Sequence, residues 1–178
     1  MIPIHNYLIV SAICQSRSDA VNELSRACAQ CGCNLLNLSV NTLGTEMTAI
    51  LFMSGNWGAI AKMEAVIPSI EQRLGLTTMV RRTSESTIHG QWMTYNLQLV
   101  AIDKPGILNG LSEFLYKASV PIEDISAHTY QTATGTRMVS MTLKIKVPET
   151  MHLASLREKL IGYCDDNNLD AYIEPFRH

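Results

Sequence analysis

Apolar and polar residues alternate with a period of two over residues 95–101, which read YNLQLVA. This period is typical of a half-buried β-strand. The tetrapeptide DKPG follows at residues 103–106, and an Asp ahead of a Pro that fits a first helical turn is a helix-start signal. Apolar residues then recur at helical spacing over residues 107–118. The pattern predicts a strand followed by a helix.

The rest of this half predicts two more strands, a helix and a closing strand. Alternation returns at residues 125–129, a Thr-Gly turn follows at 134–135, and an apolar run at 138–147 ends before a proline. These features predict a β-hairpin. Apolar residues at helical spacing over 153–164 indicate a second helix, and residues 169–173 indicate a fourth strand. The predicted order is therefore βαββαβ.

The first half of the chain repeats this pattern. A shift of 87 places aligns Asn22 with Asn109, and after a four-residue insertion in the second copy Met47 aligns with Met138. The corresponding elements of the first copy are strands at 7–14, 35–42, 46–53 and 76–82, and helices at 19–31 and 57–74. Pro68 is expected to bend or break the second of these helices.

The duplicated order predicts the fold class. We expect an α+β protein of two tandem ferredoxin-like domains, each a four-stranded antiparallel sheet with two helices on one face. The domains are placed at residues 1–84 and 85–178, with the polar stretch 83–91 as the linker. Because the other face of each sheet must be solvated or paired, we also expect extensive pairing between domains or a homo-oligomer.

Three cysteines, Cys28, Cys31 and Cys33, lie within the six residues CAQCGC. Under the 87-place shift their counterparts, and that of Cys14, are all apolar. Free cysteine behaves as a small hydrophobic residue and is among the most buried residue types. Cys28 and Cys31 share the core-facing stripe of the predicted helix, so both are expected to be buried. No metal site is predicted, because a fourth ligand at matching spacing is missing.

Charge and composition disfavour several classes of protein. The chain has 14 Lys and Arg against 16 Asp and Glu, a net charge of −2, and the basic residues are scattered, which disfavours direct binding of nucleic acid. The first apolar run, residues 7–13, has no basic flank and is far shorter than the roughly 20 residues of a membrane span. We expect a cytoplasmic protein with reduced thiols and no membrane partner.

Other proteins of βαββαβ order fit the sequence less well. RNA-recognition domains need aromatic residues on the central strands, and the stretches TEMTAILFM and TRMVSMTLKI supply no such pair. Acylphosphatases hold phosphate in a glycine-rich loop with an Arg, whereas CQSRSDA has Arg17 but no glycine. The sequence also lacks a nucleophile elbow and a phosphate-binding loop. We expect neither enzymatic activity nor a cofactor, and a small phosphate-handling enzyme is the catalytic alternative.

The stretch DKPGILNGLSEFLYKASVPI, residues 103–122, resembles the signature of ACT domains, the small-molecule sensing modules of many amino-acid-regulated proteins. Gly106 lets the backbone approach a small ligand closely, and the N–H groups that open the helix suit a carboxylate. Asp103 could receive the ammonium group of the ligand. A helix cap with a tight turn is the alternative interpretation of the same residues.

The resemblance implies a ligand site assembled from two domains. The implied residues are Asp103, Lys104, Pro105, Gly106 and Ile107 of the second copy, with Asn34 and Leu35 of the first. Asn34 stands at the start of a second strand, where similar ACT domains carry an Asn that completes a neighbouring pocket, and its counterpart is Pro121. The first copy has Ser16, Ser18 and Asp19 in place of the loop motif, so no ligand is expected there.

Two such domains with the stretches GCNLLNLSVNTLG, LFMSGNW, MEAVIPSIEQRLGL and VRRTSE also resemble a family of repressors of the glycine cleavage system. That resemblance implies a cytoplasmic negative regulator of transcription that lacks a DNA-binding domain of its own. It would act by contact with a transcriptional activator protein, with glycine as the expected signal. A general amino-acid-sensing module that regulates another enzyme or regulator is the alternative. The sequence leaves open whether the domains pair within or between chains.

Overall fold

The computed structural model describes residues 6–15, 17, 19–84 and 91–176. The chain divides into two compact units, Met1–Thr87 and Ile88–His178. Their junction falls within the segment 85–90, which lies outside the described residues, and the boundary predicted after residue 84 adjoins this segment. Each unit is described by itself.

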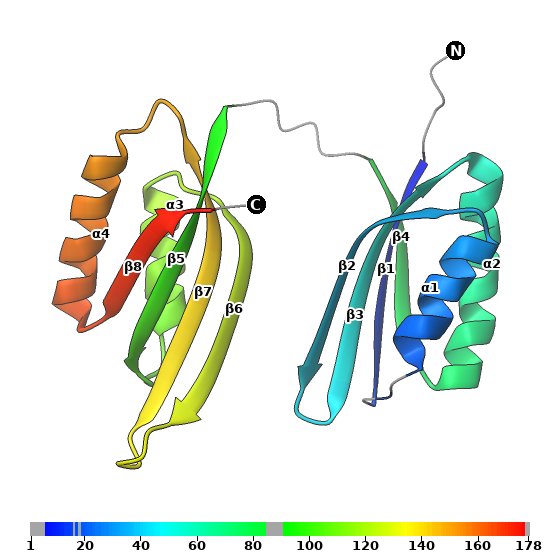
Figure 1. The fold of residues 1–178 in the computed structure, drawn as a ribbon, viewed down its shortest axis with the longest axis horizontal. Helices are drawn as coiled ribbons and strands as arrows, with labels where there is room; N and C mark the ends of the chain where they lie inside the picture. The colour runs from blue at the N-terminus through cyan, green and yellow to red at the C-terminus, as the bar shows by residue number, and fades with distance from the viewer. Residues whose placement is uncertain (1–5, 16, 18, 85–90, 177–178) are drawn as a thin grey trace. The chain divides into compact units, whose positions relative to one another are not determined.

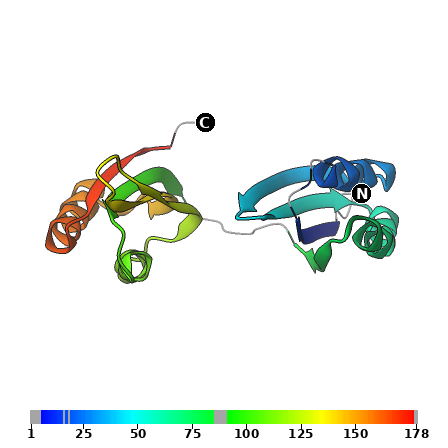
Figure 2. The same cartoon turned by 90° about the horizontal axis from the view of Figure 1, so that it is seen from below.

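The first unit is an antiparallel sheet with two helices on one face (Figures 1 and 2). Its elements are β1 (Asn6–Gln15), α1 (Ala20–Gln30), β2 (Asn34–Leu43), β3 (Glu46–Gly55), α2 (Trp57–Leu74) and β4 (Thr77–Thr83). The four strands lie in the order β2-β3-β1-β4, which is the order of a ferredoxin-like sheet.

The second unit has the same architecture (Figure 1). Its elements are β5 (Trp92–Ile102), α3 (Ile107–Lys117), β6 (Ile122–Gln131), β7 (Arg137–Pro148), α4 (Leu153–Asn167) and β8 (Asp170–Pro175). The strand order is β6-β7-β5-β8. The predicted fold class of two βαββαβ units is therefore confirmed.

The duplication extends to an irregularity in the backbone. β2 shifts its pairing with β3 between Leu35 and Asn37, and β6 shifts its pairing with β7 between Ile122 and Asp124. These two positions are 87 residues apart (122 − 35), which is the spacing of the repeat. A β-bulge bends a strand and increases its local twist. Both sheets are therefore expected to bend at equivalent positions, near the start of β2 and of β6.

The predicted four-residue insertion in the second copy is wrong by one residue. Cys14 pairs with Met47, and Ala101, which is the counterpart of Cys14, pairs with Val139 rather than with Met138. β7 is thus displaced from β3 by 92 places (139 − 47), and the insertion has five residues (92 − 87). Because successive side chains of a strand point to opposite faces, an error of one place would put every side chain on the wrong face.

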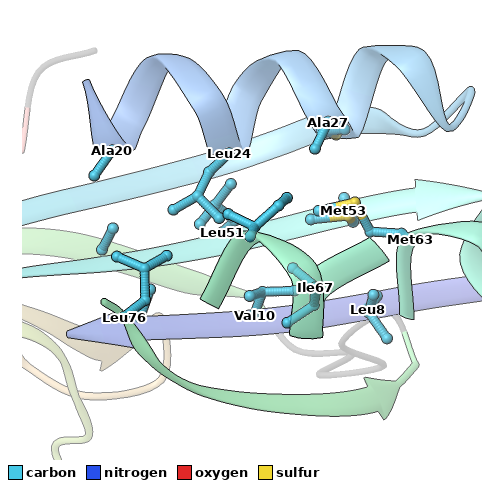
Figure 3. Close-up of a cluster of buried hydrophobic side chains, with 14 of the residues drawn as sticks. Leu8, Val10, Ala20, Leu24, Ala27, Leu51, Met53, Met63, Ile67 and Leu76 are labelled. Atoms are coloured by element: carbon cyan, nitrogen blue, oxygen red, sulfur yellow. The ribbon is translucent and has the colours of Figure 1, made fainter. Parts of the chain in front are cut away.

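Each unit has its own hydrophobic core between the sheet and the helices. In the first unit, Leu8, Leu24, Leu51 and Ile67 come from β1, α1, β3 and α2 and meet in one cluster (Figure 3). Burying a side chain of this size stabilises the folded state by about 1.5–3 kcal/mol. The equivalent cluster of the second unit contains Leu97, Leu111, Leu143 and Leu160. The amphipathic pattern is sufficient to place these residues.

The helix α2 continues through Pro68, so of the two predicted outcomes, a bend or a break, the break does not occur. A proline inside a helix removes one backbone hydrogen bond. Here Ile67 and Ile70, both 2% exposed, pack on the core on either side of it. The helix is also capped, because the side chain of Asn56 accepts a hydrogen bond from the Ala59 N–H at 2.8 Å. Tertiary packing and the cap together offset the cost of the proline.

The first sheet carries an apolar surface on the face that its helices leave uncovered. Ile13, Ile50 and Met79 point to this face and are 43%, 50% and 68% exposed. Tyr7 and Phe52 also lie on it and stack with ring centroids 5.6 Å apart. This aromatic pair joins two central strands, which the individual strand sequences did not reveal.

Four of the five cysteines are buried, namely Cys14, Cys28, Cys33 and Cys164. Cys31 is only half-buried but packs against the core, so the core-facing position is confirmed for Cys28 and Cys31, and full burial for Cys28 alone. Burial raises the pKa of the Cys33 and Cys164 thiols to about 11. Among the described residues, no group of three or more His, Cys, Asp or Glu side chains is placed to hold a metal ion. No helix in the described part of the chain is both long enough and apolar enough to cross a membrane.

Candidate functional site

The connection between β5 and α3, residues 103–106, forms a corner at one end of the second unit. Gly106 precedes the helix with φ of 92°, a left-handed conformation that favours glycine. Its carbonyl accepts a hydrogen bond from the Gly110 N–H at 2.9 Å, which closes the first helical turn. The N–H groups before Gly110 have no partner within the helix and carry partial positive charge. The corner therefore favours an anionic group.

Asp103 is held at this corner by the first residue of β7. The Asp103 N–H donates to the Arg137 carbonyl at 2.9 Å, and Arg137 Nε lies 3.1 Å from Asp103 Oδ2 in an ion pair. The Asp103 side chain is 28% exposed and that of Arg137 is 68% exposed. The pair thus presents one negative and one positive group to solvent, side by side.

Lys104, Pro105 and Ile107 have different surroundings. Lys104 Nζ donates to the Asn167 carbonyl at 3.2 Å, at the end of α4. A cation at this end of a helix stabilises its unpaired carbonyl groups, so Lys104 ties the loop to α4. Ile107 is 6% exposed and belongs to the core, while Pro105 is exposed. Of the five predicted loop residues, Asp103 and Gly106 are the two with groups suited to a polar ligand.

The equivalent corner of the first unit is closed by its own ion pair. Arg17 Nε and Nη2 donate to the two carboxylate oxygens of Asp19 at 2.6 and 2.7 Å. The hydrogen bonds from Arg17 lower the pKa of Asp19. Arg17 Nη1 also donates to the Leu74 carbonyl at 2.9 Å. Ser16 and Ser18, which the sequence places in this loop, lie outside the described residues.

Arg17 and Lys104 occupy equivalent positions of the two units. They are 87 residues apart (104 − 17), and each donates to a backbone carbonyl at the end of the second helix of its unit, Leu74 or Asn167. The cation that anchors the corner is therefore common to both units. The carboxylate of Asp19 has no counterpart in the second unit, where the equivalent residue is Gly106.

Asn34 and Leu35 open β2 of the first unit. Asn34 is exposed and lies opposite Ser54 of β3, while Leu35 packs partly against the core. Asn34 is thus accessible at the start of its strand, as the resemblance implies. A pocket that joins Asn34 with Asp103 and Gly106 stays a prediction, because Asn34 belongs to the first unit and the other two residues belong to the second.

Arg137 is the residue of this corner that sequence analysis missed. It follows a hairpin loop of residues 132–136 that is held by hydrogen bonds, with the Thr132 N–H donating to the Thr136 carbonyl at 2.9 Å and the Thr136 N–H to Thr132 Oγ1 at 3.1 Å. The available signal was the insertion itself, since an antiparallel β5–β7 pair brings the start of β7 beside the end of β5.

Comparison with known proteins agrees with this architecture. Residues 6–81 match one model of the ACT domain, and residues 89–163 match a second. The chain belongs to the tandem ACT-domain proteins. The fold and the resemblance inferred from the loop sequence are thereby confirmed. Residues 83–88 of the predicted linker lie between the two matched segments, and residues 89–91 fall within the second.

Two curated relatives span most of the chain. The glycine cleavage system transcriptional repressors of Escherichia coli (strain K12) and Shigella flexneri are each 24% identical over 170 residues, covering 94% of this chain and 89% of the relative. A crystal structure of a proposed glycine cleavage system transcriptional repressor has a TM-score of 0.77 at 22% identity and covers 98% of this chain and 99% of its own. An unknown protein from Galdieria sulphuraria also has a TM-score of 0.77, at 18% identity, with coverage of 97% and 99%. The two solved structures share the fold of this tandem ACT-domain protein.

Proposed function

We propose that this tandem ACT-domain protein is an amino-acid-responsive regulator of transcription that represses the glycine cleavage system. Glycine is its proposed signal, and a transcriptional activator protein is its proposed partner. One observation carries the proposal: the chain consists of two ACT domains and is similar over 94% of its length to a glycine cleavage system transcriptional repressor. An architecture of two sensing modules suits a protein that reports ligand occupancy to a partner.

The corner of the second unit supports an amino-acid ligand. The Asp103 carboxylate suits an ammonium group, and the N–H groups that open α3 suit a carboxylate. Gly106 has no side chain, and a Cβ built on it has no atom within 4 Å, so the space beside the backbone is open. A ligand as small as glycine fits such an open corner. Asn34 is proposed to complete the pocket from the other type of unit.

Contact with a protein is favoured over direct binding of DNA. Binding DNA requires many Lys and Arg side chains that face phosphates. The affinity of such binding falls steeply as the salt concentration rises. The net charge here is −2, and Arg17, Arg26, Arg73 and Arg82 are engaged with carboxylates. A cytoplasmic location is also proposed. Its support is that the five cysteines are free thiols, as expected in a reducing compartment.

An acylphosphatase-like activity is disfavoured by the position of Arg17. Its guanidinium is engaged by Asp19 and by the Leu74 carbonyl, whereas a phosphate-handling enzyme needs that group free for the anion. The remaining alternative is an ACT module that regulates another enzyme or regulator. It differs from the proposed function in its partner and not in its ligand site.

A homo-oligomer is proposed through the uncovered face of the first sheet. That face exposes Ile13, Ile50 and Met79, and apolar surfaces of this kind mark protein interfaces. Glu46 and Arg81 lie on the same face with opposite charges, which suits a surface that pairs with a second copy of itself. Light scattering measures the resulting mass directly.

The experiment that tests the function is a pull-down of the glycine cleavage activator with and without glycine. Linkage requires that glycine and the activator change each other's affinity by the same factor. We expect glycine to change the amount of activator retained. Equal retention at all glycine concentrations would reject the sensor role, and a shift of operator DNA by this protein alone at physiological salt would reject the protein-contact mechanism.

A further inference from the structure

We infer that Arg137 is the residue that recognises the ligand's carboxylate and thereby makes the corner of the second unit selective for a zwitterionic amino acid. This inference rests on the proposed function, since it assigns a new residue to the same site. The starting point is the ion pair between Arg137 and Asp103, which a bound ammonium group would have to displace.

The ion pair sets a condition on any ligand. Arg137 Nε lies 3.1 Å from Asp103 Oδ2. An ammonium group that binds the Asp103 carboxylate competes with this contact and leaves the guanidinium without its partner. The exposed guanidinium is then solvated by water alone, so the modest stabilisation of an exposed ion pair is lost unless an anion on the ligand takes the place of Asp103. A zwitterion supplies that anion itself, because its carboxylate is joined to its ammonium group by a single carbon.

Arg137 has the donors for this second contact. A guanidinium carries five N–H donors in a planar fork that matches a carboxylate. Nε faces Asp103, and the side chain is 68% exposed, so the outer edge of the fork is accessible to a ligand. An inserted zwitterion therefore exchanges one ion pair for two, Asp103 with the ammonium and Arg137 with the carboxylate.

The position of Arg137 is fixed by an element that only the second unit has. In the first unit the hairpin is tight, with Leu43 opposite Glu46. In the second, Gln131 pairs with Arg137 around a five-residue loop (132–136) that carries its own hydrogen bonds. The residue equivalent to Arg137 in the first unit is Thr45, which carries no charge. The insertion thus adds a charged residue of the third strand to the corner of the second unit, whereas the equivalent Thr45 adds no charge in the first unit.

The test uses glycine and glycinamide, which keeps the ammonium group but has no carboxylate. Titration calorimetry on the wild-type protein is expected to give about tenfold or more tighter binding of glycine. In Arg137→Gln we expect glycine to lose about two- to fivefold in affinity, and glycinamide to change little, so that the discrimination narrows to the part that the N–H groups of α3 supply. Arg137→Lys is expected to restore part of it, because a charge remains without the fork.

Arg157→Gln is the matched control, since Arg157 is also an exposed arginine of the second unit but donates from α4 to the Ile173 carbonyl rather than pairing with Asp103. Thermal unfolding without ligand checks that each variant is folded. Unchanged glycine affinity and discrimination in Arg137→Gln would overturn the inference and leave the proposed function standing. Tighter glycine binding in that variant would also overturn it, because Arg137 would then only compete for Asp103. If wild-type protein binds neither compound, both the inference and glycine sensing fail.

Discussion

The two units have matching cores and contrasting surfaces. Leu51 and Leu143 occupy equivalent places in β3 and β7 and are 1% and 0% exposed. One residue earlier on the same strands, where side chains point away from the helices, the first unit has the apolar Ile50 and the second has the polar Thr142. Burial thus constrains a position to be apolar, whereas an uncovered face is free to differ between units.

The corners differ in the same way. The first unit fills its corner with the Arg17–Asp19 ion pair, and the second replaces Asp19 by Gly106 and places Asp103 and Arg137 beside the opening. We propose that the units divide two tasks. The second is proposed to bind the amino acid, and the first to supply the apolar face for association.

The largest effects are expected where the two units are alike. Leu51→Ala and Leu143→Ala should each lower the free energy of unfolding by about 2–5 kcal/mol, because each removes a buried side chain and leaves a cavity. Urea unfolding followed by circular dichroism measures both. Similar losses support equivalent cores. A cost below about 1 kcal/mol for either one would show that its core is not packed as described.

The next effect separates the two corners. Glycine at about 100 times its dissociation constant stabilises the folded state by roughly 2.7 kcal/mol, which corresponds to about 5–10 °C in melting temperature for a chain of this size. Asp103→Asn should abolish most of that shift, and Asp19→Asn should leave it intact. A thermal-shift series on both variants measures this. Loss of the response in Asp19→Asn alone would show that the ligand binds the first unit and not the second.

A third comparison tests the uncovered faces. Ile50→Lys should weaken self-association by about tenfold or more, since it places a charge in an apolar interface. Thr142→Lys makes the same substitution at the equivalent, exposed position of the second unit and should have no effect. Light scattering over a dilution series reports the mass of each. Equal behaviour of the two variants would mean that the apolar face is not the contact surface.

The smallest effect concerns two of the buried thiols, one from each unit. Burial raises the pKa of Cys33 and Cys164 to about 11 from an ordinary value of 9.0. The folded state thus favours the neutral thiols, and this contribution to stability is complete below pH 9 and is lost as the pH rises towards 11. When the pH is raised from 8 to 10.5, the urea midpoint should fall less in the Cys33→Ala/Cys164→Ala variant than in wild type. An equal fall in both proteins would contradict a role for these thiols.

The half-buried Cys31 gives a related check by chemical labelling. At neutral pH it should react with a thiol reagent before Cys28, because Cys28 is 2% exposed and burial raises its pKa. Mass spectrometry of peptides from partly labelled protein identifies the first site. Labelling of Cys28 ahead of Cys31 would contradict the described packing of α1.

Hydrophobic periodicity was sufficient to predict the fold, because each element buries one face and the pattern occurs twice. It was insufficient for details that depend on pairing or packing. The length of the insertion was misjudged because Met47 and Met138 match as letters, while only the strand register shows that they point to different faces. Pro68 was expected to bend or break α2 because its local cost is visible in the sequence, whereas the packing that keeps the helix continuous is not.

The candidate site was predictable only as far as it is local. The loop from Asp103 to Gly106 is a contiguous motif, so its helix-start geometry could be read directly. Arg137 is more than thirty positions away and reaches Asp103 through the antiparallel pairing of β5 with β7. The sequence marked this place only by an insertion whose consequence depends on strand order.

The central claim is that the second unit, and not the first, contains the amino-acid site. The most direct measurement is a titration of isotope-labelled protein with glycine, followed through the backbone amide signals. We predict saturable shifts at residues 106–109, which open α3, and at Arg137, with no shift at the equivalent residues 19–22 of the first unit. Absence of any shift, or shifts confined to residues 19–22, would contradict the account.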